Sequence, residues 1–316
     1  MPKDVYVIDL FCGCGGFSTG ARQAGAKVIL AVDCWKEALA VHEANHPDTE
    51  HLCTTLGGDL DEFGSFLSGF IDMNVPPGGH VHLHASPPCQ NLSLANSARN
   101  TEVGMELVEW TVELIELLNG SLNTWSIEQV RHPKVRAYFN ERQMYYKVVK
   151  MHLYGLCAHR NRIISTSFDA NHIWVERGGD VKTFKDSCDA VGYDIPPNIT
   201  HISNATEHTR NFLRGINEPC FTVTSRSPLL YDGEKERTMP LSIISALQSF
   251  PSSYQFAPTS PYSFTRQIIA NAFPPMIAQL LIHHICSDNP QPLRARNDIS
   301  ADNNMSVADG NQWALP

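Results

Sequence analysis

The start of the chain restricts the fold most, because a strand, a glycine-rich turn and a helix follow one another there. Val5–Leu10 is a short apolar run, typical of a central parallel strand that is covered on both faces. Gly13, Gly15 and Gly16 follow, and they let a ligand approach bare backbone beside the positive end of a helix. The segment predicts a doubly wound, mostly parallel α/β sheet with a nucleotide-type ligand at its first turn.

A second predicted strand narrows the choice of ligand. Lys27–Val32 repeats the pattern and ends at Asp33, about 20 residues beyond the turn, where an acid can accept hydrogen bonds from both hydroxyls of a ribose. The turn and Asp33 together favour an adenosine-containing cofactor, and because the glycines lack the Gly-x-Gly-x-x-Gly spacing that cradles a pyrophosphate, NAD is the less attractive choice. Asp59, after Gly57-Gly58 at the end of a weak third strand, could reach the adenine edge. An isolated acid is more often a helix N-cap.

One cysteine stands where a nucleophile would be expected. Cys89 follows the apolar run Val81–His84 and two prolines, which end a strand because proline cannot donate to its ladder. Ligands of open α/β sheets bind outside the carboxyl ends of the strands. A free cysteine is more often a small buried hydrophobe, but this setting favours chemistry.

Charged side chains follow the next strands. Thr124–Val130 is predicted to be a strand with Glu128 at its mouth, where a carboxylic acid can supply a proton or a hydrogen bond. The alternative is a plain surface acid. Arg160 and Arg162 alternate, so in an extended segment they share a face and could hold a carboxylate, a base or a phosphate.

These groups together suggest one reaction. An adenosyl cofactor without pyrophosphate fits S-adenosylmethionine, and a cysteine is needed only when the methyl acceptor is not itself nucleophilic. Carbon 5 of cytosine is such an acceptor: thiolate addition at C6 makes an enamine, and Glu128 at N3 stabilises the developing charge. In a duplex the base must leave the stack, so the loop bearing Cys89 is expected to close over it.

The composition limits the classes of protein to which this chain can belong. The formal charge of −9 argues mildly against a protein that coats nucleic acid. A basic run from Arg131 to Arg162 is compatible with a surface that faces phosphate groups, although such runs are usually solvated faces. The nine cysteines and 14 histidines show no finger-like ligand spacing, so we expect reduced thiols and no metal. No stretch approaches the ~20 apolar residues that span a bilayer, and we expect a cytoplasmic protein, or one located wherever its target lies.

The pattern divides the chain into parts. We predict a catalytic domain over 1–169 and 239–286, a small irregular β-rich lobe over 170–238, and a disordered tail over 287–316 that is rich in Asn, Asp, Ser and Pro.

Taken in order, the motifs resemble those of the cytosine-C5 DNA methyltransferase family over nearly the whole chain. The matching segments are Asp9–Gly16, Pro88-Cys89-Gln90, Glu128-Gln129-Val130, Arg160-Asn161-Arg162, Arg237–Phe256 and Asn271–Pro275. The resemblance implies a Rossmann-like methyltransferase sheet with a target-recognition lobe, S-adenosylmethionine as cofactor, and a monomer that acts on a flipped cytosine in double-stranded DNA. It also suggests a place in restriction–modification.

The resemblance also assigns site residues. It makes Cys89, Glu128, Arg160 and Arg162 catalytic, with the arginines binding the base or ordering the catalytic loop. The cofactor contacts that it implies are Asp9, Phe11, Gly13, Gly15, Gly16, Asp33, Cys34, Asp59, Leu60, Pro88, Asn271 and Ala272.

Four positions depart from the family pattern. Gln129 replaces asparagine and is one methylene longer, so we expect it to disturb a hydrogen bond that steadies the Pro-Cys loop. Ala158 replaces glutamine and Ala270 replaces glycine. Cys34 stands where an aromatic residue often stacks on adenine, and the neighbouring Trp35 is a candidate substitute. We expect an active enzyme that these changes slow.

Two alternatives stay open. Cys220-Phe221-Thr222 is similar to a tripeptide of the branch that methylates cytosine in tRNA, although the following residues do not continue the match. A catalytically idle DNA-binding homologue is disfavoured by the intact Cys89.

Overall fold

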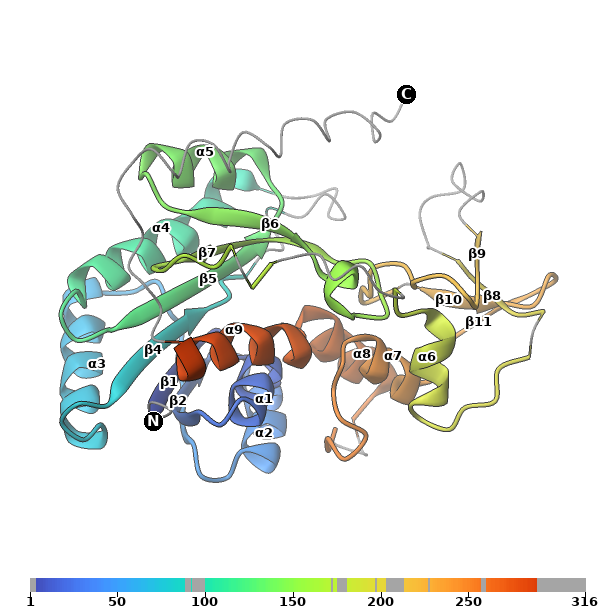
Figure 1. Ribbon diagram of the computed structural model, residues 1–316, viewed down its shortest axis with the longest axis horizontal. Coiled ribbons are helices and arrows are strands. Elements are labelled where there is room, and N and C mark those ends of the chain that lie inside the picture. The colour runs from blue at the N-terminus through green and yellow to red at the C-terminus, as the bar shows by residue number, and fades with distance from the viewer. Residues whose placement is uncertain are drawn as a thin grey trace.

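The computed structural model describes residues 4–88, 92, 100–171, 173–174, 181–196, 198–202, 213–226, 228–256 and 260–288. Among them lies a seven-stranded sheet of order β3-β2-β1-β4-β5-β7-β6 (Figure 1). Its strands are β1 (Val5–Leu10), β2 (Lys27–Asp33), β3 (Glu50–Cys53), β4 (His80–Ala85), β5 (Thr124–Val130), β6 (Tyr146–Lys150) and β7 (Asn161–Thr166). All neighbours pair in parallel except β7, which is antiparallel to β5 and β6. The mostly parallel α/β sheet predicted from the sequence is confirmed.

Helices cover both faces of this sheet. The first face is packed by α3 (Leu60–Asn74), α4 (Thr101–Leu117) and α5 (Pro133–Glu141), and the second by α1 (Gly16–Gln23) and α9 (Pro275–Asp288). α2 (Lys36–Asn45) links β2 to β3. The central strands β1 and β4 are buried at every position because both faces are covered.

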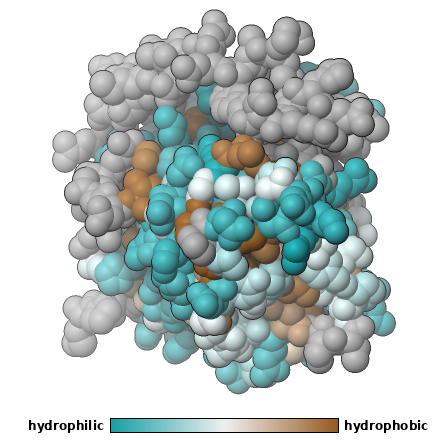
Figure 2. Space-filling model, turned by 90° about the vertical axis from the view of Figure 1, so that its right-hand side faces the viewer, coloured by the Kyte–Doolittle hydropathy of each residue, from teal (hydrophilic) through white to brown (hydrophobic). Residues whose placement is uncertain are grey.

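A smaller antiparallel sheet stands at the opposite end from α3 (Figure 1). It has the order β11-β10-β8-β9, formed by β8 (Thr200–Ile202), β9 (Leu213–Gly215), β10 (Leu229–Tyr231) and β11 (Glu236–Arg237). It shares an apolar cluster with α6 (Phe184–Asp189), α7 (Leu241–Leu247) and α8 (Tyr262–Asn271). The β-rich lobe is confirmed, whereas its boundaries at 170 and 238 stay a prediction. Figure 2 shows this end of the molecule, where hydrophilic side chains surround smaller apolar patches.

One sequence-based boundary was wrong. The third strand is Glu50–Cys53, and the stretch before Asp59 is a bend that leads into α3. β6 ends at Lys150, because Met151–Tyr154 turns into a short 3₁₀ helix. The stretch Tyr262–Ser287 is long and apolar enough to cross a membrane by length and composition alone, but 72% of its most apolar window is buried inside the protein. Residues 289–316 lie outside the described part.

Candidate active site at the carboxyl ends of the strands

The β1–α1 turn is held open by backbone geometry that favours glycine. Phe11, Gly13 and Gly15 have φ values of 57°, 54° and 89°. Both carboxylate oxygens of Asp33 accept backbone N–H groups, Oδ2 from Gly13 and Oδ1 from Trp35, each at 2.8 Å. A Cβ atom added at Gly13 would meet no described atom within 4 Å. The turn therefore borders open space, and Asp33 stiffens its rim.

Asp33 keeps the capacity for a further partner. Each carboxylate oxygen has two lone pairs, and the bonds from Gly13 and Trp35 use one on each. Burial raises the pKa of Asp33, and the N–H groups of Trp35, Gly13 and Cys34 oppose that shift. The free lone pairs fit the predicted ribose contact.

Asp9 lies beneath the turn. Its side chain is 1% exposed and accepts a hydrogen bond from Ser18 Oγ at 2.7 Å. Burial raises the pKa of Asp9 to about 7. Any contribution of Asp9 to cofactor binding is therefore indirect, through the first turn of α1.

The late motif returns to the first turn, as the sequence suggested. A Cβ atom on Gly16 would overlap the carbonyl oxygen of Phe273, so only glycine allows this approach. Ala272 is buried in the same segment, while Asn271 is exposed at the end of α8. Tyr254 also closes the turn by donating its hydroxyl to the Cys14 carbonyl. Sequence reasoning missed Tyr254, because a lone tyrosine in a loop forms no pattern.

Two of the residues expected near the adenine ring, Asp59 and Trp35, already contact other parts of the protein. Asp59 caps α3 by accepting from the Glu62 N–H at 2.9 Å, so the N-cap interpretation is confirmed, and Leu60 is the first residue of that helix. Cys34 is exposed. Trp35 packs edge-on against Phe264, with ring centroids 5.4 Å apart. The half-buried indole thus has a protein partner already.

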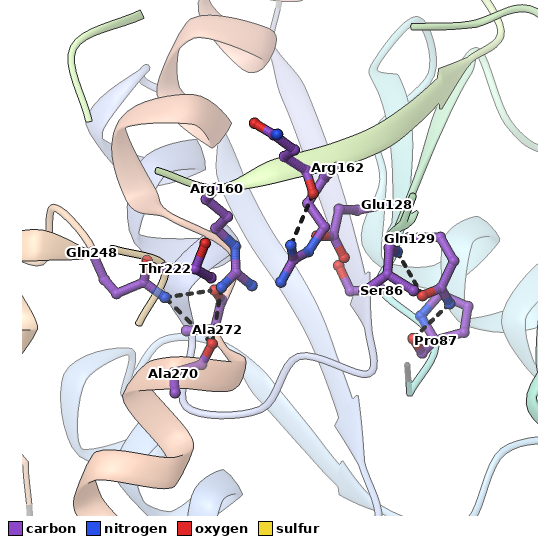
Figure 3. A network of polar contacts seen from close by, with 12 residues as sticks. Ser86, Pro87, Glu128, Gln129, Arg160, Arg162, Thr222, Gln248, Ala270 and Ala272 are labelled. Carbon is purple, nitrogen blue, oxygen red and sulfur yellow. Dashed lines mark hydrogen bonds and ion pairs between the residues drawn. The ribbon is translucent and has the colours of Figure 1, made fainter. Parts of the chain in front are cut away.

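The stem of the predicted catalytic loop is anchored by Gln129 (Figure 3). Gln129 Nε2 donates to the Pro87 carbonyl at 3.1 Å, while its Oε1 accepts the Val130 N–H at 2.8 Å. The longer side chain therefore makes the contact that we expected it to disturb. Pro88 follows and is exposed. Cys89 and Gln90 lie outside the described residues.

The two arginines act differently. Arg162 Nε lies 2.8 Å from Glu128 Oε1, and these side chains are only 14% and 9% exposed. Arg160 is buried and donates from Nη1 to the Ala270 carbonyl at 3.0 Å (Figure 3). Gln248 Nε2 donates to the neighbouring Ile269 carbonyl at 3.0 Å. Arg162 thus orients the candidate acid, whereas Arg160 ties the entry of β7 to the end of α8.

The basic run between Arg131 and Arg162 is partly neutralised by the acidic face of α4. Lys134 pairs with Glu102, and Arg142 pairs with Glu116 at 3.3 Å. These members of the run hold two helices together at the surface, which weakens the expectation of a phosphate-facing patch there.

The buried Cys220 has a structural role. Its N–H donates to the Cys157 carbonyl and its carbonyl accepts the His159 N–H, both at 2.8 Å. Thr222 Oγ1 donates to the His159 carbonyl at 2.6 Å. The tripeptide Cys220–Thr222 therefore joins the lobe to the segment that carries Arg160.

Comparison with known proteins gives consistent matches. Residues 5–119 match the family model of the C-5 cytosine-specific DNA methylases. The Type II methyltransferase M.AgeI of Thalassovita gelatinovora is 37% identical over 100 residues, which cover 32% of this chain and only 22% of that relative. M.AplI of Arthrospira platensis, also a Type II methyltransferase, is 24% identical over 316 residues, 89% of this chain and 85% of the relative.

A solved structure shares the fold. The S. pombe Dnmt2 methyltransferase superposes with a TM-score of 0.63 at 13% identity, and the match covers 88% of this chain and 97% of that one. The sheet order, the motifs in sequence order and the family match agree with one another. Residues 5–119 are therefore similar to the C5 cytosine methyltransferase family, and the fold of the described residues agrees with that match.

Proposed function

We propose that this protein transfers a methyl group from S-adenosylmethionine to carbon 5 of cytosine in double-stranded DNA, through a covalent bond between Cys89 and C6. The Glu128–Arg162 pair carries the proposal, because it holds a nearly buried carboxylate beside the stem of the Cys89 loop. An acid with a purely structural role would not have to lie at the carboxyl end of a sheet strand, which is where ligands of open α/β sheets bind.

The residues around Gly13 fit the cofactor. The space beside the turn is open, and Asp33 has unused lone pairs at its rim. Asp33 would bind the ribose, and the backbone of the β1–α1 turn would contact the adenosyl group. When bound, S-adenosylmethionine supplies the methyl group.

The protein's own groups would act in sequence on a flipped cytosine. The Cys89 thiolate adds to C6, and the electron pair of the C5–C6 bond moves toward N3. The Glu128 carboxyl donates a proton or hydrogen bond there, while Arg162 keeps it oriented. After C5 takes the methyl group, its proton leaves to solvent and the returning electron pair expels the Cys89 thiolate.

The test is methyl transfer from labelled S-adenosylmethionine to mixed-sequence duplex DNA, followed by bisulfite sequencing. Methylated cytosines in a defined context would support the proposal, and Cys89→Ser should abolish them. Transfer to tRNA but not to duplex DNA would show that the substrate is tRNA and not DNA. Binding of 5-fluorocytosine DNA without a covalent adduct would identify an idle homologue and overturn the reaction.

The relatives named as Type II methyltransferases suggest the setting. We propose that the methylated sequence is also the target of a companion restriction endonuclease, and that the protein works as a monomer wherever that DNA is. The small lobe that includes β8 to β11 would contact the target.

A further inference from the structure

A row of hydrogen-bonded histidines runs along β4 toward the catalytic loop. His80, His82 and His84 lie on one face of β4, and Thr124 and Ser126 of β5 stand between them. The bonds join His80 Nε2 to Thr124 Oγ1 at 2.9 Å, His82 to Thr124 at 2.9 Å and to Ser126 at 3.0 Å, and His84 to Ser126 and Ser86 at 2.8 Å each. We call these six residues the histidine ladder.

The ladder is sealed from water near the site. His82, His84 and Ser126 are 0% exposed. The Phe17 ring stacks on His84 with centroids 3.5 Å apart and planes 2° from parallel, and Phe273 approaches edge-on. Burial lowers the pKa of His82 to about 3 and that of His84 well below its usual value, so both rings are neutral.

Because the rings are neutral, each hydrogen bond of the ladder has a defined donor and a defined acceptor. Each ring then has one N–H and one acceptor nitrogen, and each hydroxyl has one proton to donate. Ser126 contacts Nε2 of His82 and Nδ1 of His84. When Ser126 donates to one ring and accepts from the other, the two rings share one tautomer, and its choice decides whether Ser86 donates or accepts at the far end.

That end meets the active site. Ala85 and Ile127 are the last paired residues of β4 and β5, so Ser86 and Glu128 are the next positions on the ladder's face (Figure 3). Ser86 precedes Pro87, which Gln129 binds. The stem of the loop thus has two anchors, one at Ser86 and one at Pro87.

We propose that His84 is a positioning residue for cytosine methylation, which acts by holding the Ser86 hydroxyl and with it the stem of the loop that carries Cys89. This inference rests on the proposed function. The neighbouring serine and histidine reach no reacting atom themselves; they keep the thiol's loop in one place.

The decisive variant is Ser86→Ala, compared with Ser165→Ala. Ser165 is also fully buried in the sheet and donates one hydrogen bond, to the Tyr145 carbonyl at 2.6 Å, but lies outside the ladder. In a single-turnover assay on duplex DNA, Ser86→Ala should slow methyl transfer about tenfold, the value of one hydrogen bond. Ser165→Ala and the conservative Ser86→Thr should stay near the wild-type rate, with cofactor affinity unchanged in all three.

A spectroscopic measurement tests the ladder directly. Nitrogen-15 NMR of labelled histidines should show His82 and His84 neutral and in the same tautomer, and Ser86→Ala should shift the His84 Nε2 signal while Ser165→Ala does not. A His84 Nε2 signal that Ser86→Ala leaves unchanged, or equal rates for Ser86→Ala and wild type, would overturn this inference alone. A wild-type protein that methylates no DNA would overturn the proposed function and this inference together.

Discussion

Gln129 donates its side-chain N–H to the carbonyl oxygen of Pro87 at 3.1 Å, across the gap between β5 and the end of β4. The bond joins the strand that carries Glu128 to Pro87, two residues before the proposed nucleophile Cys89. The side chain that makes it stands on a strand, which is where precise catalytic geometry is best maintained.

The first prediction concerns this link. Gln129→Met keeps the length of the side chain but leaves the Pro87 carbonyl unpaired, which should lower the free energy of unfolding by about 1–3 kcal/mol. Gln129→Asn falls one methylene short and should slow single-turnover methylation. Urea denaturation and rapid-quench assays measure the two effects. An Asn variant as fast as wild type would show that the bond is dispensable.

The second prediction concerns the acid. Glu128→Gln keeps the size of the side chain but cannot supply a proton, so the rate of methyl transfer should fall about 100-fold, as general acid–base catalysis typically contributes. Arg162→Ala, which removes the ion pair at 2.8 Å, should slow the same step. Cofactor affinity, measured by calorimetry, should not change. A matching loss of cofactor binding in both variants would argue for a structural role.

The third prediction uses two glycines in left-handed conformations. Gly13 and Gly25 both have positive φ, and a Cβ atom would meet no described atom within 4 Å of either. Alanine at each should therefore cost about 1–2 kcal/mol of stability. Only Gly13→Ala adds a methyl group beside the proposed cofactor, and only it should weaken S-adenosylmethionine binding. Equal affinities in the two variants would place the cofactor elsewhere.

The fourth prediction concerns pH. Burial lowers the pKa of His82 to about 3 and that of His201 to about 4. In the unfolded chain histidine takes up a proton near pH 6.5, so the unfolded state binds more protons as the pH falls from about 6 to about 5. Each histidine should then remove about 1.4 kcal/mol of stability per pH unit.

Asp9 opposes this trend. Burial raises its pKa to about 7, so over the same range the folded state binds a proton that the unfolded state lacks. With the two histidines dominant, the free energy of unfolding should still decrease toward acid. Asp9→Asn should make the decrease steeper. Urea titrations at several pH values measure it, and a stability that rises toward acid would contradict the assignment.

Much of the sheet was predictable from the sequence, because burial on both faces leaves continuous apolar runs such as Val5–Leu10. The turn with Gly13 and the position of Asp33 at the end of β2 were predictable for a similar reason: both depend on local spacing. Asp59 was harder, since a helix N-cap and a ligand contact require the same residue type.

The differing roles of the two arginines were not predictable. Alternation placed Arg160 and Arg162 on one face, but Arg160 bonds to Ala270, a residue 110 positions later, on α8. Tyr254 reaches Cys14 across a still longer separation of 240 residues. Such contacts depend on how α8 and the loops near it pack, and no local pattern encodes that packing.

The sequence by itself indicated the family resemblance, the order of the strands along the chain and the candidate reacting groups, since these follow from motifs, residue type and short-range periodicity. Tertiary structure alone decided which partners those groups meet. His80, His82 and His84 are visible in the sequence, but Thr124 and Ser126 join them only because β4 and β5 pair in one register. Register is set by the burial of whole strands, and a shift of one residue would turn these side chains to the other face.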